Sequence, residues 1–477
     1  MGRALQTTVS DVTILKFGGT SVADAAAFTR VVTIVRRHGG PRPVVVVSAL
    51  AGMTDALFAG AAAAAEGDVA RARGIVDEQL ARHDGVGRAL LQGDAALPFQ
   101  DQLAHARDEL TGLLDRLAGR AEQPAGLQDE IVSYGERLSA SLLAAALAAA
   151  GVPARTVDAR RCVITDETHG RATPLPAETE RHTQAELVPL LEAALVPVLG
   201  GYIAATPGGR TTTLGRGGSD YTAALVGAAL AAREIQIWTD VSGVLTADPR
   251  VVPGARPIPR LSYAEAAELA YFGAKVLHPK TIEPATARRI PVRICNSLAP
   301  DDPGTVVAAE PAVWPGAVKA IAHKTGITVL QIASTRMLGA YGFLRALFEV
   351  FDRHRTVVDV VTTSEVSVSL TLEDARALPA IVSELRALGE VSVEPHRAIV
   401  CVVGEGLRTT PGIAARIFST VQDINVSLIS QGASRVNLTF VIAEDRVHEA
   451  VRRLHEACFE HARPATGPDA AIGRAAS

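Results

Sequence analysis

The sequence lacks a cysteine framework. Its 477 residues include only four cysteines, which lie far apart and form no C-x-x-C pair. This spacing excludes a small scaffold held together by disulfides. We expect buried or unreactive thiols in a protein that works in a reducing cytoplasm.

The sequence also lacks long hydrophobic runs and an excess of one charge. Its longest apolar stretches, residues 140–150 and 223–232, are alanine-rich and shorter than the roughly 18 residues of a membrane span. Lysine and arginine total 47 against 51 aspartates and glutamates, a net charge of -4. No basic stripe with interleaved aromatic residues is present. We therefore expect neither a membrane nor a nucleic acid as a partner.

Short β-branched runs alternate with helical patterns over the N-terminal part of the chain. Strand patterns at residues 12–17 and 44–48 enclose a helical pattern at 23–37, and further strand patterns follow at 196–204, 234–239 and 291–295. Such alternation predicts an α/β fold in which helices sandwich a mainly parallel sheet.

Composition also suggests where the domains divide. The chain is 48% hydrophobic over 477 residues, enough material for several cores. Residues 61–128 are rich in alanine and charge, so we interpret them as a helical insertion. Proline and glycine at 300–315 mark a linker. We assign residues 1–310 to one domain and place the main boundary at this linker.

Beyond the linker the sequence repeats itself. Gly342 and Gly412, Phe348 and Phe418, Ser364 and Ser434, and Val366 and Val436 are each 70 positions apart. Each copy reads strand, helix, strand, strand, first over 328–333, 342–354, 357–362 and 366–372, then over 399–403, 412–422, 426–430 and 436–443. Because one such unit buries little surface alone, two copies sharing a face make physical sense. We interpret the repeat as regulatory.

Three motifs in the first domain combine glycines with charged residues. They are KFGGTS at 16–21, TLGRGGSD at 213–220 and FGAKVLHP at 272–279. Each puts a charged residue beside glycines or at the end of a predicted element, where backbone N–H groups and a fixed charge can converge on phosphate. The motifs therefore predict a phosphoryl-transfer enzyme.

These motifs, together with WTDVSG at 238–243 and TADPR at 246–250, closely resemble those of aspartate kinases in the amino-acid kinase superfamily. The repeat resembles that family's tandem ACT modules, here 316–395 and 396–465, followed by a flexible tail at 466–477. Residues 342–344 and 362–368 resemble the single-function, lysine-sensitive branch. The resemblance implies an amino-acid kinase fold followed by two ferredoxin-like ACT modules.

The chemistry of such a kinase can be argued from the residues. An aspartate side chain is ionised at neutral pH, so its attack on phosphorus needs no general base. Lys16 ends a predicted strand before Gly18 and Gly19, where it can neutralise charge on the transferring phosphoryl group while backbone N–H groups approach the nucleotide. The alternative is a solvated lysine at a strand end.

Two charged residues of the second motif carry further roles by resemblance. The family implies that Asp220 organises the catalytic lysine and that Arg216 grips a substrate carboxylate, which suits a planar guanidinium. A structural interpretation, in which Ser219 and Asp220 cap a helix and match its dipole, can hold together with these roles. By the same resemblance, Glu136 receives the substrate ammonium and Thr54 contacts the substrate carboxylate. Without the resemblance, Glu136 reads as a solvated helix residue.

The resemblance also implies a nucleotide site for ATP. Its residues would be Lys16, Gly18, Gly19, Thr239, Asp240, Leu245, Arg250 and Lys275, with the last two facing phosphates. Aspartates beside Pro and Gly can instead be ordinary turn residues. Leu245 stands where relatives usually carry tyrosine, and leucine cannot hydrogen-bond a nucleotide. Mg²⁺ is implied by ATP, but we assign it no protein ligands because it keeps waters and borrows phosphate oxygens.

The first ACT module is the expected effector site. The residues that match the family's lysine-binding surface are Met337, Phe343, Leu344, Val358, Asp359, Ser364 and Glu365. Acidic groups suit a basic effector. Ala340, Tyr341, Thr356 and Val357 replace more polar residues of lysine-inhibited relatives. Two modules that serve only as a dimer interface are the alternative.

The sequence therefore predicts an ATP-dependent aspartate kinase that makes 4-phospho-L-aspartate, the first step toward lysine and diaminopimelate, threonine and methionine. We expect feedback regulation by lysine and a homodimer or larger homo-oligomer. Two alternatives stay open. One is a related carboxylate kinase that acts on a glutamate-type substrate, whose side chain is one methylene longer than that of aspartate. The other is a catalytically degenerate amino-acid sensor.

Overall fold

The computed structural model describes residues 11–120, 125–273, 277, 279–310, 314, 317–339 and 341–460. Packing divides the chain into two compact units. The first comprises Met1–Val244, Pro259–Tyr263 and Val276–Glu310, and the second comprises Leu245–Ile258, Ala264–Lys275 and Pro311–Ser477. The tail expected at 466–477 lies outside the described residues, and the expected domain boundaries stay predictions.

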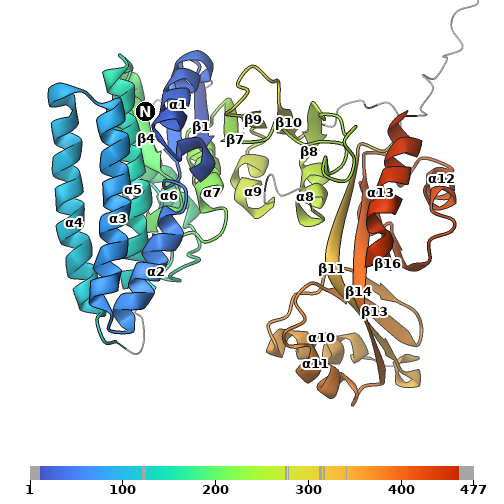
Figure 1. The fold of residues 1–477 in the computed structure, drawn as a ribbon. Helices are drawn as coiled ribbons and strands as arrows, with labels where there is room; N and C mark the ends of the chain where they lie inside the picture. Colours follow the sequence, from blue (N-terminus) through green and yellow to red (C-terminus); the bar gives the residue numbers. More distant parts are fainter. Residues whose placement is uncertain are drawn as a thin grey trace, which may run out of the picture. The chain divides into compact units, whose positions relative to one another are not determined.

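An eight-stranded sheet forms the centre of the first unit (Figure 1). Its order is β3 (Ala154–Val157), β4 (Val196–Gly200), β2 (Arg42–Val47), β1 (Val12–Phe17), β7 (Glu234–Thr239), β9 (Val292–Asn296), β10 (Thr305–Ala308) and β8 (Arg260–Ser262). All neighbouring strands are parallel except β9 and β10. The expected α/β fold with a mainly parallel sheet is confirmed.

Helices cover both faces of this sheet. Leu15 and Phe17 of β1 share a core with α1 (Ala25–His38) and α5 (Ala125–Ala149). Successive strand residues point to opposite faces, and Ile14 accordingly lies against Gly227 of α7 (Gly218–Ala229). The layer on that side also holds α6 (Pro176–Glu192) and α9 (Pro279–Ala287), which both contact α7. Lys16 therefore points toward the face that α7 covers.

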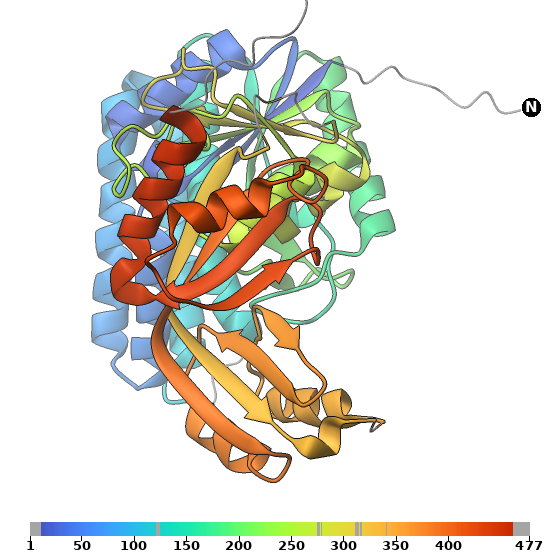
Figure 2. The same ribbon diagram turned by 90° about the vertical axis from the view of Figure 1, so that its right-hand side faces the viewer.

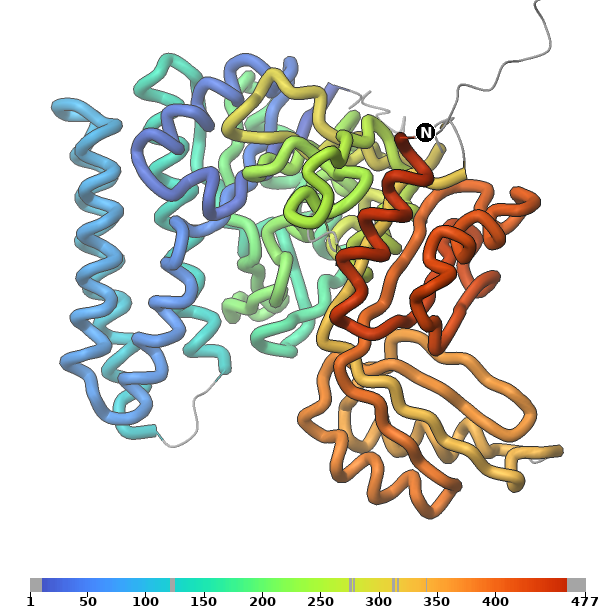
Figure 3. Tube along the Cα trace, turned by 45° about the vertical axis from the view of Figure 1, so that its right-hand side comes forward, coloured from blue at the N-terminus to red at the C-terminus, as the bar shows by residue number. Residues whose placement is uncertain are grey.

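Long helices extend the first unit away from the sheet. Helices α2 (Met53–Ala65), α3 (Val69–Leu90) and α4 (Leu97–Leu117) pack against one another and on α5, and they run side by side in Figures 1 and 3. Short helical turns η1 (Gly19–Val22), η2 (Gly93–Ala96) and η3 (Ala159–Arg161) connect other elements.

Several short strands differ from the sequence-based expectation. The pattern over 196–204 is broken after Gly200, and Ile203–Ala205 forms β5, which pairs with β6 (Thr211–Thr213) as a separate hairpin. The interpretation of 300–315 as a linker is wrong where β10 pairs with β9 and β8. Strands of three or four residues carry too little periodicity to be found from sequence.

The second unit contains one six-stranded antiparallel sheet (Figure 2). Its order is β12 (Val361–Thr363), β13 (Ser367–Leu372), β11 (Ala320–Ala333), β14 (Glu390–Val403), β16 (Asn437–Ala443) and β15 (Val426–Gln431). The helices and helical turns are α8 (Tyr263–Tyr271), η4 (Thr335–Met337), α10 (Phe343–Arg353), α11 (Leu378–Leu385), α12 (Ile413–Thr420), η5 (Glu444–Arg446), α13 (Val447–His455) and η6 (Glu456–Glu460).

Strands β11 and β14 run through both repeat copies. Residues 320–324 of β11 pair with 399–403, whereas residues 328–333 pair with β13 and with the first half of β14. Two separate apolar cores lie on this sheet, one built around Leu330 and Leu347 and the other around Val400 and Phe440. The antiparallel sheet with two cores confirms the ACT-type architecture.

No helix in the described part of the chain is long and apolar enough to span a bilayer.

Candidate active site

A cavity of about 480 Å³ lies in the first unit at the carboxyl ends of β1, β2 and β4. Ligands of parallel α/β sheets bind at this edge. The lining includes Lys16, Gly19, Ser48, Thr54, Glu136, Tyr202, Arg216, Ser219 and Asp220. The structure thus brings five of the predicted catalytic and substrate residues, from four separate sequence segments, around one cavity.

An ion pair links β1 to the first turn of α7. The Lys16 Nζ lies 2.7 Å from the Asp220 Oδ1, and both side chains are largely buried. Gly217 precedes α7 with a left-handed φ of 74°, a conformation that suits glycine. No side chain caps the helix, so the expectation that Ser219 and Asp220 act as its N-cap is wrong. Asp220 does match the positive end of the helix dipole.

Glu136 is a buried carboxylate with an unused oxygen. It is 3% exposed, its Oε1 accepts a hydrogen bond from the Ala49 N–H at 3.3 Å, and its Oε2 has no partner among the described residues. Burial raises the pKa of Glu136 to about 8. Gly200 makes this position possible, because a Cβ there would lie 2.8 Å from the Glu136 Cβ. A cation in the cavity would relieve the cost of ionising this buried acid.

Arg216 and Thr54 complete the polar lining. Arg216 is exposed, and Thr54 is half-buried in the first turn of α2. No hydrogen-bond or ion-pair partner among the described residues holds the Arg216 guanidinium. The cavity therefore combines a lysine–aspartate pair, a buried acid and a free guanidinium, which can bind a small zwitterion with a further carboxylate beside an anionic group.

Comparison with known proteins decides the family. The model of the amino acid kinase family matches residues 11–296, and that of the ACT domain matches residues 400–458. Lysine-sensitive aspartokinase 3 of Escherichia coli is 38% identical over 466 residues, which cover 95% of this chain and 100% of that protein. The chain belongs to the aspartokinase family. The resemblance inferred from the motifs is thereby confirmed.

Two solved aspartokinase structures show the same fold. E. coli aspartokinase III in complex with aspartate and ADP (R-state) has a TM-score of 0.79 at 37% identity, covering 94% of this chain and 99% of that one. The same enzyme in complex with lysine and aspartate (T-state) also gives a TM-score of 0.79 at 37% identity, covering 94% and 100%.

The residues predicted to bind nucleotide in this aspartokinase family member fall in both units. Thr239 ends β7 in the first unit and Asp240 follows it, and the Thr239 hydroxyl donates to the Asp240 carboxylate at 3.1 Å. Leu245 and Arg250 belong to residues 245–258 of the second unit. Arg250 is exposed and pairs with Asp248 at 2.7 Å. Lys275 lies outside the described residues.

The first glycine motif places Gly18 beside the Lys16 ammonium. A Cβ on Gly18 would lie 3.5 Å from the Lys16 Nζ, so glycine keeps the space beside the ammonium open. The described residues contain no group of three or more His, Cys, Asp or Glu able to hold a metal.

The predicted effector residues lie in the second unit of this aspartokinase. Met337, Phe343 and Val358 pack on the core of the first module, and Leu344 follows Phe343 in the first turn of α10. Asp359 accepts a hydrogen bond from the Tyr271 hydroxyl, and its Oδ1 lies 3.7 Å from the Lys324 Nζ. Ser364 and Glu365 are exposed in the turn between β12 and β13.

Several cavity residues were not predicted from the sequence. The Ser48 hydroxyl donates to the Ser219 hydroxyl at 3.0 Å, and Tyr202 lies in the left-handed region with a φ of 66°. Ser48 is the last residue of the strand predicted over 44–48, which is a usable signal because strand ends line such sites. No local pattern marks Tyr202.

Proposed function

We propose that this protein is an ATP-dependent aspartate kinase that transfers the γ-phosphoryl group to the side-chain carboxylate of L-aspartate. A carboxylate oxygen forms a bond to the γ-phosphorus while the bond to the oxygen shared with the β-phosphate breaks, giving 4-phospho-L-aspartate and ADP. The observation that carries the proposal is the single cavity shared by the Lys16–Asp220 pair, Glu136 and Arg216. This step opens the biosynthesis of lysine, threonine and methionine.

Lys16 is the proposed catalytic cation. Its ammonium neutralises charge on the transferring phosphoryl group, and Asp220 at 2.7 Å fixes its direction. Such preorganised charges stabilise the transition state because they need not reorient during the reaction. No residue has to act as base, since the attacking carboxylate is already ionised.

Glu136, Arg216 and Thr54 are the proposed binding residues for aspartate. The unpaired Oε2 of Glu136 suits the substrate ammonium, and the free guanidinium of Arg216 suits the carboxylate that does not react. Thr54 supplies a hydroxyl to the same carboxylate. A substrate with one more methylene would place its reacting carboxylate differently, so aspartate is favoured over glutamate.

The proposed nucleotide residues are Gly18, Gly19, Thr239, Asp240, Leu245, Arg250 and Lys275, beside Lys16. E. coli aspartokinase III has been solved with aspartate and ADP, which supports ATP as the phosphoryl donor. Mg²⁺, when bound to the nucleotide, would neutralise phosphate charge.

We also propose feedback inhibition by lysine at Met337, Phe343, Leu344, Val358, Asp359, Ser364 and Glu365. A relative with 38% identity is lysine-sensitive by name, and another structure of that enzyme holds lysine. Exposed apolar side chains of the first module support association with a second copy; they are Leu338, Tyr341, Leu344, Phe348, Val357, Val361 and Val366. The proposal includes a cytoplasmic location.

Trapping the product with hydroxylamine tests the proposal. Purified protein is mixed with ATP, Mg²⁺, hydroxylamine and either aspartate or glutamate, and the hydroxamate is measured. We expect ATP-dependent hydroxamate from aspartate and little from glutamate. Product from glutamate alone would favour the related carboxylate kinase, and no product from folded protein that binds lysine would favour the sensor.

A further inference from the structure

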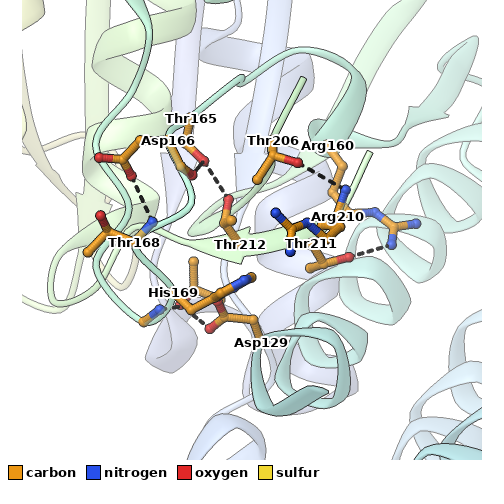
Figure 4. A network of polar contacts seen from close by, with 12 residues as sticks. Asp129, Arg160, Thr165, Asp166, Thr168, His169, Thr206, Arg210, Thr211 and Thr212 are labelled. Carbon is orange, nitrogen blue, oxygen red and sulfur yellow. Dashed lines mark hydrogen bonds and ion pairs between the residues drawn. The ribbon is translucent and has the colours of Figure 1, made fainter. Parts of the chain in front are cut away.

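Strand β6 beside the cavity is held by a dense polar network. Its three threonines are buried, and each has a different partner; Figure 4 shows Thr211 and Thr212 with their partners. Thr211 accepts from the Arg160 guanidinium at 3.0 Å, Thr212 and Thr165 share a hydrogen bond of 2.7 Å, and Thr213 donates to Asp129 at 2.7 Å. Thr213, which makes the third contact, is also the first residue of the TLGRGGSD motif at 213–220 that contains Arg216.

Asp129 is the centre of this network. It lies on α5 and is 2% exposed. Its Oδ1 accepts from Thr213, and its Oδ2 accepts from the His169 Nδ1 at 2.8 Å and from the Gly170 N–H at 3.1 Å. Three donors thus occupy this buried carboxylate, so it is suited to holding protein segments in place rather than to binding substrate.

Both sides of the network converge on Gly215. Thr213 precedes it by two residues, and Gly170 approaches it in space, because a Cβ on Gly215 would lie 3.3 Å from the Gly170 carbonyl oxygen. The Ala172 N–H also donates to the Thr213 carbonyl at 2.8 Å. Asp129 therefore fixes β6 and the 166–173 loop together around the backbone that leads into Arg216.

Arg216 depends on this backbone for its position. Its guanidinium lines the cavity but is held by no hydrogen bond or ion pair from the residues that the structure describes. The path of residues 213–217 therefore decides where the guanidinium can reach. A displacement of about 1 Å in a positioning group can lower activity about 100-fold.

We propose that Asp129 is a positioning residue. Through its contacts with Thr213 and the 166–173 loop, it holds the backbone that places the Arg216 guanidinium where it can bind the substrate carboxylate. This inference rests on the proposed function of Arg216. Because Arg216 would hold the non-reacting carboxylate equally in the ground state and the transition state, loosening it raises the KM for aspartate and leaves kcat nearly unchanged.

Three variants and one matched control test the proposal. Thr213→Val removes the hydroxyl that reaches Asp129, and Asp129→Ala removes all three contacts. Asp129→Asn can keep them, because its amide oxygen accepts from His169 and Gly170 while its NH₂ turns toward the Thr213 hydroxyl. The control is Thr211→Val. This substitution removes a buried hydroxyl from the same strand, and that hydroxyl also has a charged partner, Arg160.

Steady-state kinetics give the first readout. We expect the KM for aspartate to rise roughly 10- to 100-fold in Thr213→Val and Asp129→Ala, with the KM for ATP and kcat nearly unchanged. The KM for aspartate of Asp129→Asn should lie between those of these variants and that of the wild type, and the KM of Thr211→Val should equal that of the wild type. An equal rise in Thr211→Val, or a fall in kcat alone, would overturn the positioning role.

Hydrogen exchange gives a second readout that does not depend on activity. The amides of Ala172 and Gly218 donate to the Thr213 and Gly215 carbonyls, so peptides covering 166–173 and 213–218 should exchange faster in Thr213→Val than in Thr211→Val. Unchanged exchange would reject the inference even for an active enzyme. A wild type that makes no aspartyl hydroxamate would instead reject the proposed function, and the exchange comparison would still decide whether Asp129 holds the loop.

Discussion

The Lys16 ammonium lies 2.7 Å from the Asp220 carboxylate, although the two residues are more than 200 positions apart in sequence. Lys16 points to the α7 face of β1, and Asp220 lies in the first turn of α7. The strand end and the helix start thus meet at the cavity, and each charge limits the freedom of the other. The Lys16 ammonium is thereby held in a fixed position at the cavity.

Breaking this pair should slow phosphoryl transfer. Lys16→Met is expected to lower kcat at least 100-fold, the size of effect seen when one preorganised group is removed from a transition state. Asp220→Asn should lower kcat by roughly 10- to 100-fold because Lys16 is no longer held. The hydroxamate assay measures both, with Asp55→Asn, an exposed carboxylate at the same cavity, as control. Wild-type kcat in Asp220→Asn would limit the pair to a structural role.

The raised pKa of Glu136 predicts a pH-dependent stability. Burial lifts this pKa from 4.5 to about 8, so the stability contributed by the protonated acid is present below pH 4.5 and is lost as the pH rises through about 8. Glu136→Gln stays neutral, and we expect its midpoint of thermal unfolding to exceed that of the wild type by an amount that grows between these pH values. A difference that does not vary with pH would contradict the assignment.

The same acid predicts proton release when aspartate binds. At pH 7 a group with a pKa of about 8 is mostly protonated, whereas a bound ammonium favours the ionised form. Binding should release close to one proton, and the apparent affinity for aspartate should rise from pH 6 to pH 8. Calorimetry in buffers of different ionisation enthalpy measures the release. Binding without proton release would place the ammonium elsewhere.

Lys324 predicts a change in sensitivity to the effector. Its Nζ lies 2.7 Å from Glu373 and 3.7 Å from Asp359, so it already neutralises part of the negative charge proposed to attract lysine. Lys324→Met should lower the lysine concentration for half-inhibition by roughly 3- to 10-fold, from Coulomb's law in high dielectric. Arg376→Gln, which removes an exposed cation of the same module, is the control. Weaker inhibition in Lys324→Met would show that Lys324 assists the effector instead.

Removing the cation of a buried ion pair should lower the free energy of unfolding more than removing the cation of an exposed pair. Lys319 and Glu265 are 1% and 0% exposed and lie 2.8 Å apart, whereas the Arg73 and Asp115 side chains are about half-exposed. Lys319→Met leaves a buried carboxylate without its cation and should cost about 3–5 kcal/mol. Arg73→Met should cost at most about 1 kcal/mol. Urea unfolding compares the two, and equal losses would contradict the predicted difference.

Much of the fold was predictable because its signals are local. The runs at 12–17 and 234–239 form strands as their patterns predict, and the motifs name Lys16, Arg216 and Asp220. The hairpin of β5 and β6 and strand β10 were missed, since three- or four-residue strands depend on partners far away in sequence. Asp129 was missed for the same reason: an acid on a helix looks solvated until Thr213 and Gly170 are seen to meet it.

The sequence by itself determined the family, the repeat of 70 positions and the identity of the charged groups, because motif spacing and periodicity are properties of the chain. The tertiary structure decided which of those groups share a cavity, that Ser219 and Asp220 are not the helix cap, and that β11 and β14 join both repeats into one sheet. It also decided which acids are buried. Burial and long-range pairing fix pKa values and side-chain positions, and they arise only when distant segments pack together.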